Sequence, residues 1–164
     1  MESGSQYLIK NNLNMAFEVF TEEVRRGFDC LCITREFPSK IRSRYRLDKT
    51  PVVWLSAMRT ENQATVDSLL DLSLLISNFL EKAKHGVVLL DGFEYLITNY
   101  GFNAFIRFLQ FIRSRFEHSE AILIAPLLEE ALELKQTKLI EREMKLLDAE
   151  QRTQRQRVIH GQIS

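Results

Sequence analysis

The stretch Gly86-Val87-Val88-Leu89-Leu90-Asp91-Gly92-Phe93-Glu94 decides the fold of this chain. Its central residues, Val87 to Leu90, are all apolar, which is typical of a parallel strand that is covered on both faces. The strand delivers Asp91 to its carboxyl end, where nucleotide-binding α/β proteins commonly carry an acid that orients a metal-bound phosphate. The sequence lacks the glycine-rich phosphate loop, G-x-x-x-x-G-K-[ST], that should accompany such an acid. The stretch therefore predicts the geometry of a nucleotide-binding fold without its chemistry.

Four further segments have the pattern of strands, and helical patterns separate them. These segments are Tyr7–Ile9, Phe28–Ile33, Val52–Leu55 and Ala121–Ala125, the last of which we expect Pro126 to stop. Alternation of strands and helices predicts a three-layer α/β fold with a mostly parallel sheet of about five strands. We expect Val87–Leu90 to be among the central strands.

The helical segments follow from apolar spacing and capping signals. A first helix is predicted over 13–24, with a stop at Gly27, and a short basic helix over 39–45. A mostly buried helix should begin at a capping box of Thr60 and Gln63 and run to Leu80. Two further helical pieces are predicted between 95 and 116, separated by Gly101.

A long charged helix is predicted from Glu129 to about Leu147, with sparse apolar positions. We expect it to dock near Leu132 and Leu139 and to leave the body beyond Met144. Residues 148–164 are polar and rich in Gln and Arg, which predicts a flexible tail. The organisation is therefore a single α/β domain over residues 1–147 that ends in a long C-terminal helix.

Composition limits the classes of partner. Lys and Arg number 22, as do Asp and Glu, so no overall field attracts nucleic acid or a membrane. The first five residues lack the pattern of a signal peptide, and no apolar stretch approaches the roughly 18 residues of a membrane helix. The simplest location is a reducing cytoplasm. Cys30 and Cys32 should share one face of a strand as small buried side chains, and the scattered histidines offer no metal site.

Two blocks of the sequence resemble the archaeal family known as domain of unknown function 835. The first block runs from Gly27 through Thr34-Arg35-Glu36-Phe37-Pro38 to Ser56, and the second runs from Val87 to Leu96 and continues through Phe102 and Phe108-Leu109. The resemblance covers roughly residues 7–146. It implies a role in intracellular signalling, because this domain occurs alone or behind PAS and response-regulator modules, and it implies no enzymatic activity.

A more distant resemblance is to RecA- and KaiC-type ATPase domains. It implies that Val87–Asp91 corresponds to the strand with the Walker B acid, and that Ile9–Asn14 stands where the phosphate loop would be. That segment has no glycine, and Lys10 is not followed by Ser or Thr. Because a backbone cradle for phosphate depends on tight glycine turns, we expect phosphate binding to be lost in a degenerate fold of this type.

Asp91 and Glu94 form the pair of acids most typical of a catalytic site, and two interpretations of them remain open. They could form a residual metal or nucleotide site at the carboxyl edge of the sheet. Alternatively, Asp91 caps the following helix and Glu94 interacts with its dipole. We favour the second, because one acid does not hold Mg²⁺ without phosphate co-ligands.

A basic segment after the second strand is the other candidate site. Its candidate anion- or partner-binding residues are Arg35, Lys40, Arg42 and Arg44. They could hold a phosphorylated partner, an acidic peptide or a nucleic-acid backbone, or they could pair with acids of the same domain.

The sequence favours a non-catalytic regulatory or adaptor domain of archaeal intracellular signalling that acts through protein–protein contacts. Candidate partners are signalling proteins or a second copy of the chain in a homodimer; no cofactor, metal, catalytic residue or membrane is predicted. One alternative is an atypical nucleotide-binding ATPase-like protein that works without a phosphate loop. The other, a nucleic-acid-binding regulator, is less favoured because Arg42, Arg44 and Arg46 do not form a helical stripe.

Overall fold

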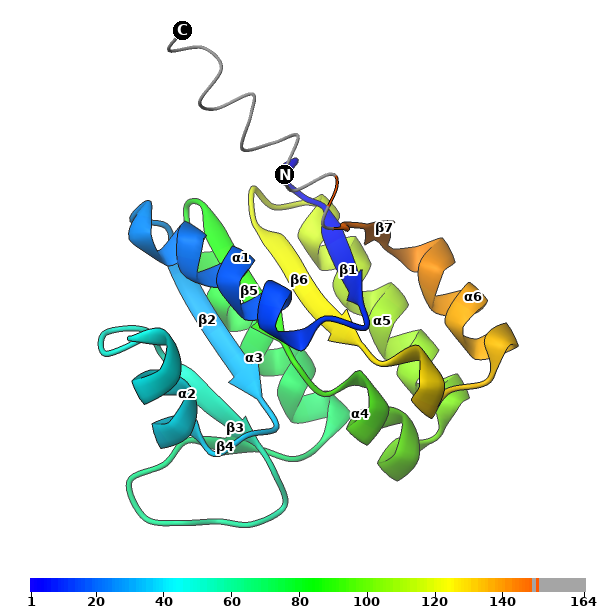
Figure 1. Ribbon diagram of the computed structural model, residues 1–164, viewed down its shortest axis with the longest axis horizontal. Helices are drawn as coiled ribbons and strands as arrows, with labels where there is room; N and C mark the ends of the chain where they lie inside the picture. Colours follow the sequence, from blue (N-terminus) through cyan, green and yellow to red (C-terminus); the bar gives the residue numbers. More distant parts are fainter. Residues whose placement is uncertain (149, 151–164) are drawn as a thin grey trace, which may run out of the picture.

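The computed structural model describes residues 1–148 and residue 150, and its centre is a seven-stranded sheet in which all pairings are parallel. The spatial order is β4-β3-β2-β5-β6-β1-β7 (Figure 1). The strands are β1 (Gln6–Lys10), β2 (Asp29–Thr34), β3 (Val52–Leu55), β4 (Thr65–Val66), β5 (Gly86–Leu90), β6 (Ile122–Leu127) and β7 (Lys145–Leu146).

The prediction of about five strands is corrected to seven. The five predicted strands are all present and occupy the middle of the sheet, with β5 between β2 and β6. The two additional strands, β4 and β7, have two residues each and lie at the two edges. A two-residue strand is too short to produce an alternating pattern, so the sequence did not reveal them.

Strand β6 runs through Pro126, which the sequence predicted to stop it. The backbone N–H of Leu123 donates to the carbonyl oxygen of Ser5, just before β1. The odd-numbered residues of β6 therefore direct their backbone N–H and C=O groups toward β1, and the backbone of Pro126 is directed toward β5. On that side, the pairing of β5 with β6 already ends at Ile124. The missing N–H of Pro126 therefore removes no hydrogen bond from the sheet.

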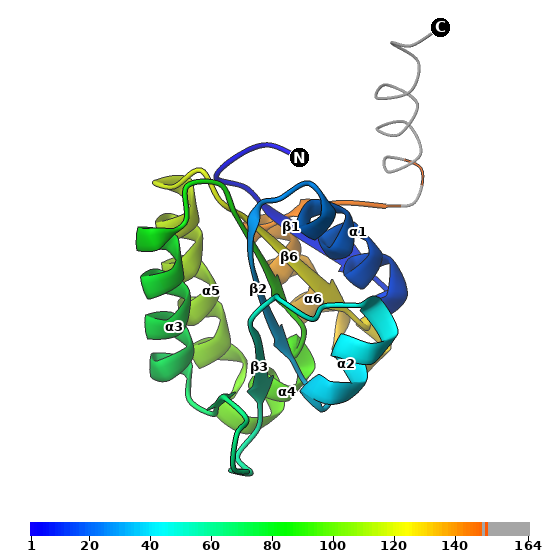
Figure 2. The same ribbon diagram turned by 90° about the vertical axis from the view of Figure 1, so that its left-hand side faces the viewer.

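Helices cover both faces of the sheet, as predicted (Figure 2). The helices α1 (Leu13–Arg25) and α2 (Pro38–Tyr45) lie on one face. The other face carries α3 (Leu69–Lys82), α4 (Phe93–Tyr100), α5 (Phe102–Glu117) and α6 (Leu134–Glu143). Alternate strand residues enter the two cores, and Cys30 and Cys32 both point toward α1.

Helix α3 begins later than predicted. Its N-cap is Ser68, whose side chain accepts from the backbone N–H of Asp71 at 3.0 Å. Thr60 and Gln63 form no capping box; Gln63 instead donates to the carbonyl oxygens of Val52 and Ala64. The capping pattern was wrong because an amide side chain can equally well tie a loop to a strand.

The prediction of one long C-terminal helix is also wrong. The segment is divided into a 3₁₀ turn, η1 (Glu129–Ala131), the ten-residue α6 and β7. Thr137 and Ile140 are the buried residues of α6, whereas Leu132 and Leu139 are only partly buried. Met144 and Leu147 are buried, so the chain stays on the body beyond Met144. The predicted flexible tail lies outside the described residues except for positions 148 and 150.

Candidate functional site at the carboxyl edge of the sheet

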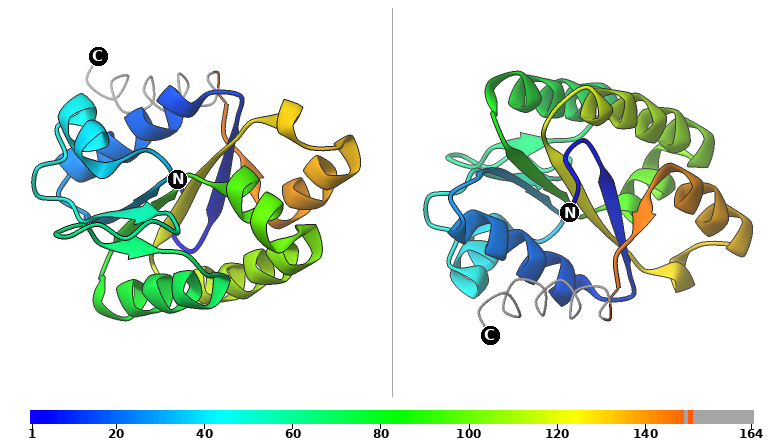
Figure 3. Two further views of the ribbon diagram at one scale, coloured as in Figure 1. Left: turned by 90° about the horizontal axis from the view of Figure 1, so that it is seen from below. Right: turned by 90° about the horizontal axis from the view of Figure 1, so that it is seen from above.

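All strands of the sheet are parallel, so their carboxyl ends meet at one edge, which is the lower edge in Figure 1 and faces the viewer in the left panel of Figure 3. The segments that follow β1, β2, β3, β5 and β6 all begin there. Ligands of open α/β folds bind at this edge, because loops can vary there without disturbing the sheet. We call it the carboxyl edge.

Asp91 follows β5 directly and is mostly buried. Its carboxylate accepts from the Thr34 hydroxyl at 3.4 Å and from the backbone N–H of Arg35, both at the end of neighbouring β2. Burial, together with the negative charge of Glu94, raises the pKa of Asp91 to about 6, although the two hydrogen bonds oppose the rise. The predicted helix-capping role is wrong: Gly92 occupies the N-cap of α4, which has no side-chain cap.

Gly92 lets the chain turn from β5 into α4 beside β3. Its φ is +151°, and an added Cβ would lie 2.4 Å from Cδ2 of Leu55. Only glycine adopts this conformation readily and leaves room for the neighbouring side chain. The turn therefore fixes where Asp91 and Glu94 stand.

Glu94 lies in the first turn of α4, as predicted from its position. Its carboxylate accepts a hydrogen bond of 2.6 Å from the backbone N–H of Leu128, just beyond β6. Glu94 therefore has two roles: its negative charge interacts favourably with the N-terminus of α4, and its hydrogen bond connects α4 to the end of β6. The charges of Asp91 and Glu94 are close enough to interact, but Asp91 accepts hydrogen bonds from the end of β2 and Glu94 accepts one from the residue after β6.

Arg35 is held at this edge by three contacts. Its guanidinium donates to the carbonyl oxygen of Leu55 and stacks over the Tyr95 ring, with Cζ 3.8 Å from the ring centroid. Its own carbonyl oxygen accepts from the indole N–H of Trp54 at 3.2 Å. Trp54 in turn meets Phe37 edge to face, with ring centroids 5.1 Å apart. Arg35 therefore belongs to an aromatic cluster.

The other predicted basic residues do not converge with Arg35 on one anion site. Arg42 donates to the carbonyl oxygens of Leu47 and Thr50 and so fixes the loop before β3. Arg44 forms an ion pair with Glu36 at 2.8 Å. Lys40 is exposed on α2. The structure thus brings Arg35, Asp91 and Glu94 to the carboxyl edge and gives Arg42 and Arg44 partners within the domain.

The place where a phosphate loop would lie, between β1 and α1, holds a closed polar cluster. The Lys10 ammonium lies 3.0 Å from Glu129 and 2.7 Å from Glu141. Asn11, with φ at +60°, donates from its side chain to the Glu129 carboxylate at 2.7 Å and accepts from the Glu129 backbone N–H at 3.0 Å. The sequence did not reveal this cluster, because the partners of Lys10 are more than 100 residues away along the chain.

The segments at the same edge carry exposed apolar side chains. Four of them, Leu13, Phe37, Met58 and Leu128, come after β1, β2, β3 and β6, and two more, Leu70 and Leu134, lie in the first turns of α3 and α6. Met58 is 65% exposed. Six of the ten large exposed apolar residues among the described ones therefore lie on segments of the carboxyl edge. Exposed apolar residues that gather in one region mark contact surfaces more often than scattered ones do.

Within residues 1–148 and 150, no three His, Cys, Asp or Glu side chains stand close enough together to hold a metal ion. In the same residues, no helix combines the length and the apolar character that crossing a bilayer requires.

The comparisons with known proteins agree with this architecture. The family model described as "Protein of unknown function (DUF835)" matches residues 9–144. A protein of Pyrococcus horikoshii OT3 has a similar structure at 9% identity, with a TM-score of 0.62 over 90% of this chain and 83% of that one. The flagellar accessory protein FlaH of Methanocaldococcus jannaschii is similar at 12% identity, with a TM-score of 0.61 over 90% of this chain and 72% of that one. No curated protein matches the sequence.

Proposed function

The chain belongs to the family described as "Protein of unknown function (DUF835)", and from this premise we propose that it is a non-catalytic regulatory or adaptor module of archaeal intracellular signalling. On this proposal the protein works in the cytoplasm and contacts partner proteins through the carboxyl edge. Its fold descends from a RecA/KaiC-like nucleotide-binding fold whose phosphate site has been replaced.

The cluster around Lys10 is the observation that carries the proposal. A phosphate loop binds through a free lysine and through backbone N–H groups that converge on one point. Here the Lys10 ammonium is already neutralised by Glu129 and Glu141, and Asn11 binds the backbone and side chain of Glu129. A phosphate would have to displace two carboxylates, whose negative charge would also repel it. The cluster therefore supports a structural replacement of the phosphate site.

The exposed apolar residues support a protein as the partner. Phe37 and Met58 stand on the segments after β2 and β3, and Phe37 packs against Trp54. Aromatic residues and methionine are enriched in the cores of protein interfaces, whereas a nucleic-acid surface would be rich in unpaired basic side chains. Because Arg42 and Arg44 are bound within the domain, the structure offers less support to the nucleic-acid alternative.

One observation favours the second candidate, an atypical ATPase-like protein. Asp91 stands at the carboxyl end of a central strand beside the Thr34 hydroxyl, where an acid can orient a metal-bound phosphate. On that hypothesis, arginine side chains near Arg35 would replace the phosphate loop.

Calorimetry with ATP and Mg²⁺ separates the two candidates. For the adaptor we expect no heat of binding at ATP concentrations up to the millimolar range, either for the native protein or for Asp91→Ala. Micromolar binding by the native protein that disappears in Asp91→Ala would overturn the proposal in favour of the ATPase-like candidate. A thermal melt of Asp91→Ala must show that the variant is folded, so that lost binding is not mistaken for unfolding.

Affinity capture from the native cell tests the proposed contact surface. The bait is the full chain, as native protein, as the double variant Phe37→Ser with Met58→Ser, and as the control Leu74→Ser with Phe111→Ser. The control removes two comparably exposed apolar side chains from α3 and α5, away from the strand ends. We expect partner proteins that the native chain and the control retain and the carboxyl-edge variant loses. Equal capture by all three baits would exclude this surface.

A further inference from the structure

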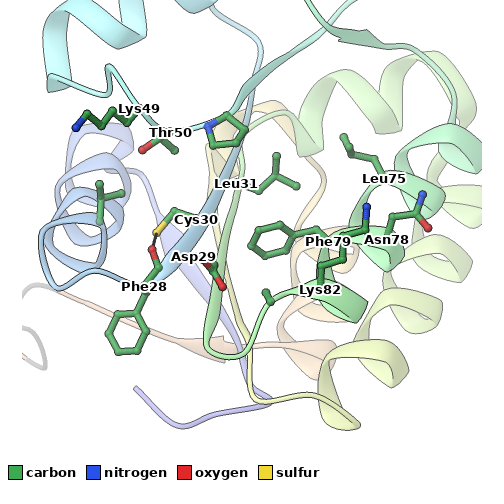
Figure 4. Close-up of a pocket in the computed structure, with 13 residues that line it drawn as sticks. Phe28, Asp29, Cys30, Leu31, Lys49, Thr50, Leu75, Asn78, Phe79 and Lys82 are labelled. Atoms are coloured by element: carbon green, nitrogen blue, oxygen red, sulfur yellow. Dashed lines mark hydrogen bonds between the residues drawn. The ribbon is translucent and has the colours of Figure 1, made fainter.

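A cavity of about 610 Å³ lies at the opposite, amino-terminal edge of the sheet (Figure 4). It is formed where the ends of α1 and α3 flank the beginning of β2. None of the residues used at the carboxyl edge lines it. Its volume is within the range of about 300–1,000 Å³ that is usual for ligand sites.

The cavity exists because β3 starts later than β2. The pairing of the two strands begins with Cys32 opposite Val52, so Asp29, Cys30 and Leu31 have no strand beside them on that side. The residue before Val52 is Pro51, which lacks the N–H that would extend the pairing. The beginning of β2 is therefore an open strand edge in an otherwise filled sheet.

The backbone of Cys30 faces this opening. The N–H of Cys32 donates to the carbonyl oxygen of Pro51 at 3.0 Å, so Cys32 directs its polar backbone groups toward the β3 side. Successive residues of a strand alternate in this direction, which places the N–H and the C=O of Cys30 on the same side as those of Cys32. A donor and an acceptor from one residue therefore stand at the position where a neighbouring strand would pair.

The walls of the cavity are apolar and its rim is cationic. Leu31 lies between Thr50 and Cys30 on one side and Leu75 and Phe79 on the other (Figure 4). The rim carries three charged residues, Lys49, Lys82 and Asp29, and their net charge is +1. Within residues 1–148, neither lysine makes an ion pair.

We propose that this cavity binds an extended peptide segment of a partner protein, which pairs with β2 at Cys30, buries an apolar side chain against Leu31 and Phe79, and places a carboxylate near Lys49 or Lys82. Strand addition gives affinity through main-chain hydrogen bonds and selectivity through side-chain pockets. The open backbone of Cys30 favours a peptide over a small amphipathic carboxylate, which would use only the walls and the lysines. The proposal does not depend on the contact surface at the carboxyl edge.

Fluorescence anisotropy with a labelled peptide tests the proposal on the full chain. The probe is the pentapeptide Asp-Val-Leu-Val-Asp, with Lys-Val-Leu-Val-Lys and decanoate as comparisons. We expect the acidic peptide to bind at least tenfold more tightly than the basic one. Methylation of the central backbone nitrogen, which removes the N–H donor, should weaken binding about tenfold, because a lost main-chain hydrogen bond in a partly buried groove is worth about 1.4 kcal/mol.

The double variant Lys49→Glu with Lys82→Glu should reverse the preference between the acidic and basic peptides. The matched control Lys84→Glu with Arg107→Glu changes two exposed basic residues outside the cavity and should leave the preference unchanged. Absence of peptide binding at millimolar concentration, binding that is insensitive to the Lys49 and Lys82 changes, or binding of decanoate alone would each overturn the proposal. These variants leave the carboxyl edge intact, so their failure is separate from failure of the proposed function.

Discussion

The Thr34 hydroxyl and the Asp91 carboxylate meet 3.4 Å apart across the ends of two paired strands, β2 and β5. The contact places a mostly buried acid beside a neutral donor, and burial is the main cause of its raised pKa. Asp91 is therefore tuned by burial more than by its partners, and its ionisation influences the free energy of unfolding.

The Asp91→Asn variant should become more stable than the native protein as the pH rises from 4 to 7. The pKa of Asp91 is 3.8 in its ordinary state and about 6 in the folded chain, so the folded state binds more protons over this interval. Its contribution to stability is fully present below pH 4 and is lost as the pH rises through 6. We expect a relative gain of about 2 kcal/mol at pH 7. Urea unfolding of both proteins from pH 4 to 8 measures it, and a pH-independent difference would contradict the raised pKa.

The Gly92→Ala variant should lose roughly 2–4 kcal/mol of stability, because a side chain at φ +151° is strained and its Cβ would overlap Leu55. The control is Gly27→Ala, where φ is +85° but no atom lies within 4 Å of an added Cβ. That control should lose only about 1 kcal/mol from backbone strain. Equal losses in chemical denaturation would show that the approach of Leu55 is unimportant.

The Glu94→Ala variant should lose about 1 kcal/mol, since it removes the acceptor of the Leu128 N–H at the end of β6. Glu94→Gln keeps an acceptor oxygen and should lose less. Both changes remove the negative charge that raises the pKa of Asp91, so both should move the pH dependence described above to lower pH. NMR titration of the Asp91 carboxyl carbon checks the shift, and an unchanged midpoint would contradict it.

The Lys10→Met variant should lose about 1–2 kcal/mol at pH 7, because Glu129 and Glu141 would face each other without their shared cation. Lys10 holds the pKa of both carboxyls below the ordinary value, so the penalty should fade as acid protonates them in the variant. Thermal melts at pH 7 and pH 3.5 measure the difference. A loss that is equal at both pH values would point to packing of the lysine stem.

Cys30 and Cys32 should react slowly with a disulfide reagent in the native protein. Burial raises the pKa of the Cys30 thiol from 9.0 to about 12 and that of Cys32 still further. The thiolate of Cys30 is thereby depleted about 1,000-fold near pH 8. Release of the coloured thiol product, followed at pH 8, should show two reactive thiols per chain only after denaturation. Rapid reaction of either thiol in the folded protein would refute the prediction.

The sequence revealed those parts of the fold that have a strong local pattern. The apolar run from Val87 to Leu90 identified the central strand, and apolar spacing located α1, α4 and α5. Strands of two residues carry no such pattern, so β4 and β7 were missed. The apolar positions after Glu129 matched a long helix because the local pattern does not show that Met144 and Leu147 are buried by β1 and its neighbours.

The candidate site was predicted less well than the sheet, because its contacts join distant parts of the chain. The position of Asp91 at the carboxyl edge followed from the strand that precedes it, but its bonds to Thr34 and Arg35 did not. Lys10 and Glu141 are 131 residues apart, and no local signal paired them. Such side chains contact their partners only once the chain has folded, and a single sequence does not show which distant residues come together.

The two-residue strands β4 and β7 have a consequence for behaviour at high concentration. Long bare strand edges promote sheet-to-sheet aggregation, and proteins suppress it by making their outermost strands short. The backbone N–H of Leu147 donates to Leu8 at 2.9 Å, so the segment around β7 shields the side of β1 that would otherwise be bare. A chain cut after Met144 would lack β7 and leave one side of β1 without a partner strand, and we expect it to form soluble oligomers or precipitate at concentrations at which the intact chain stays dispersed.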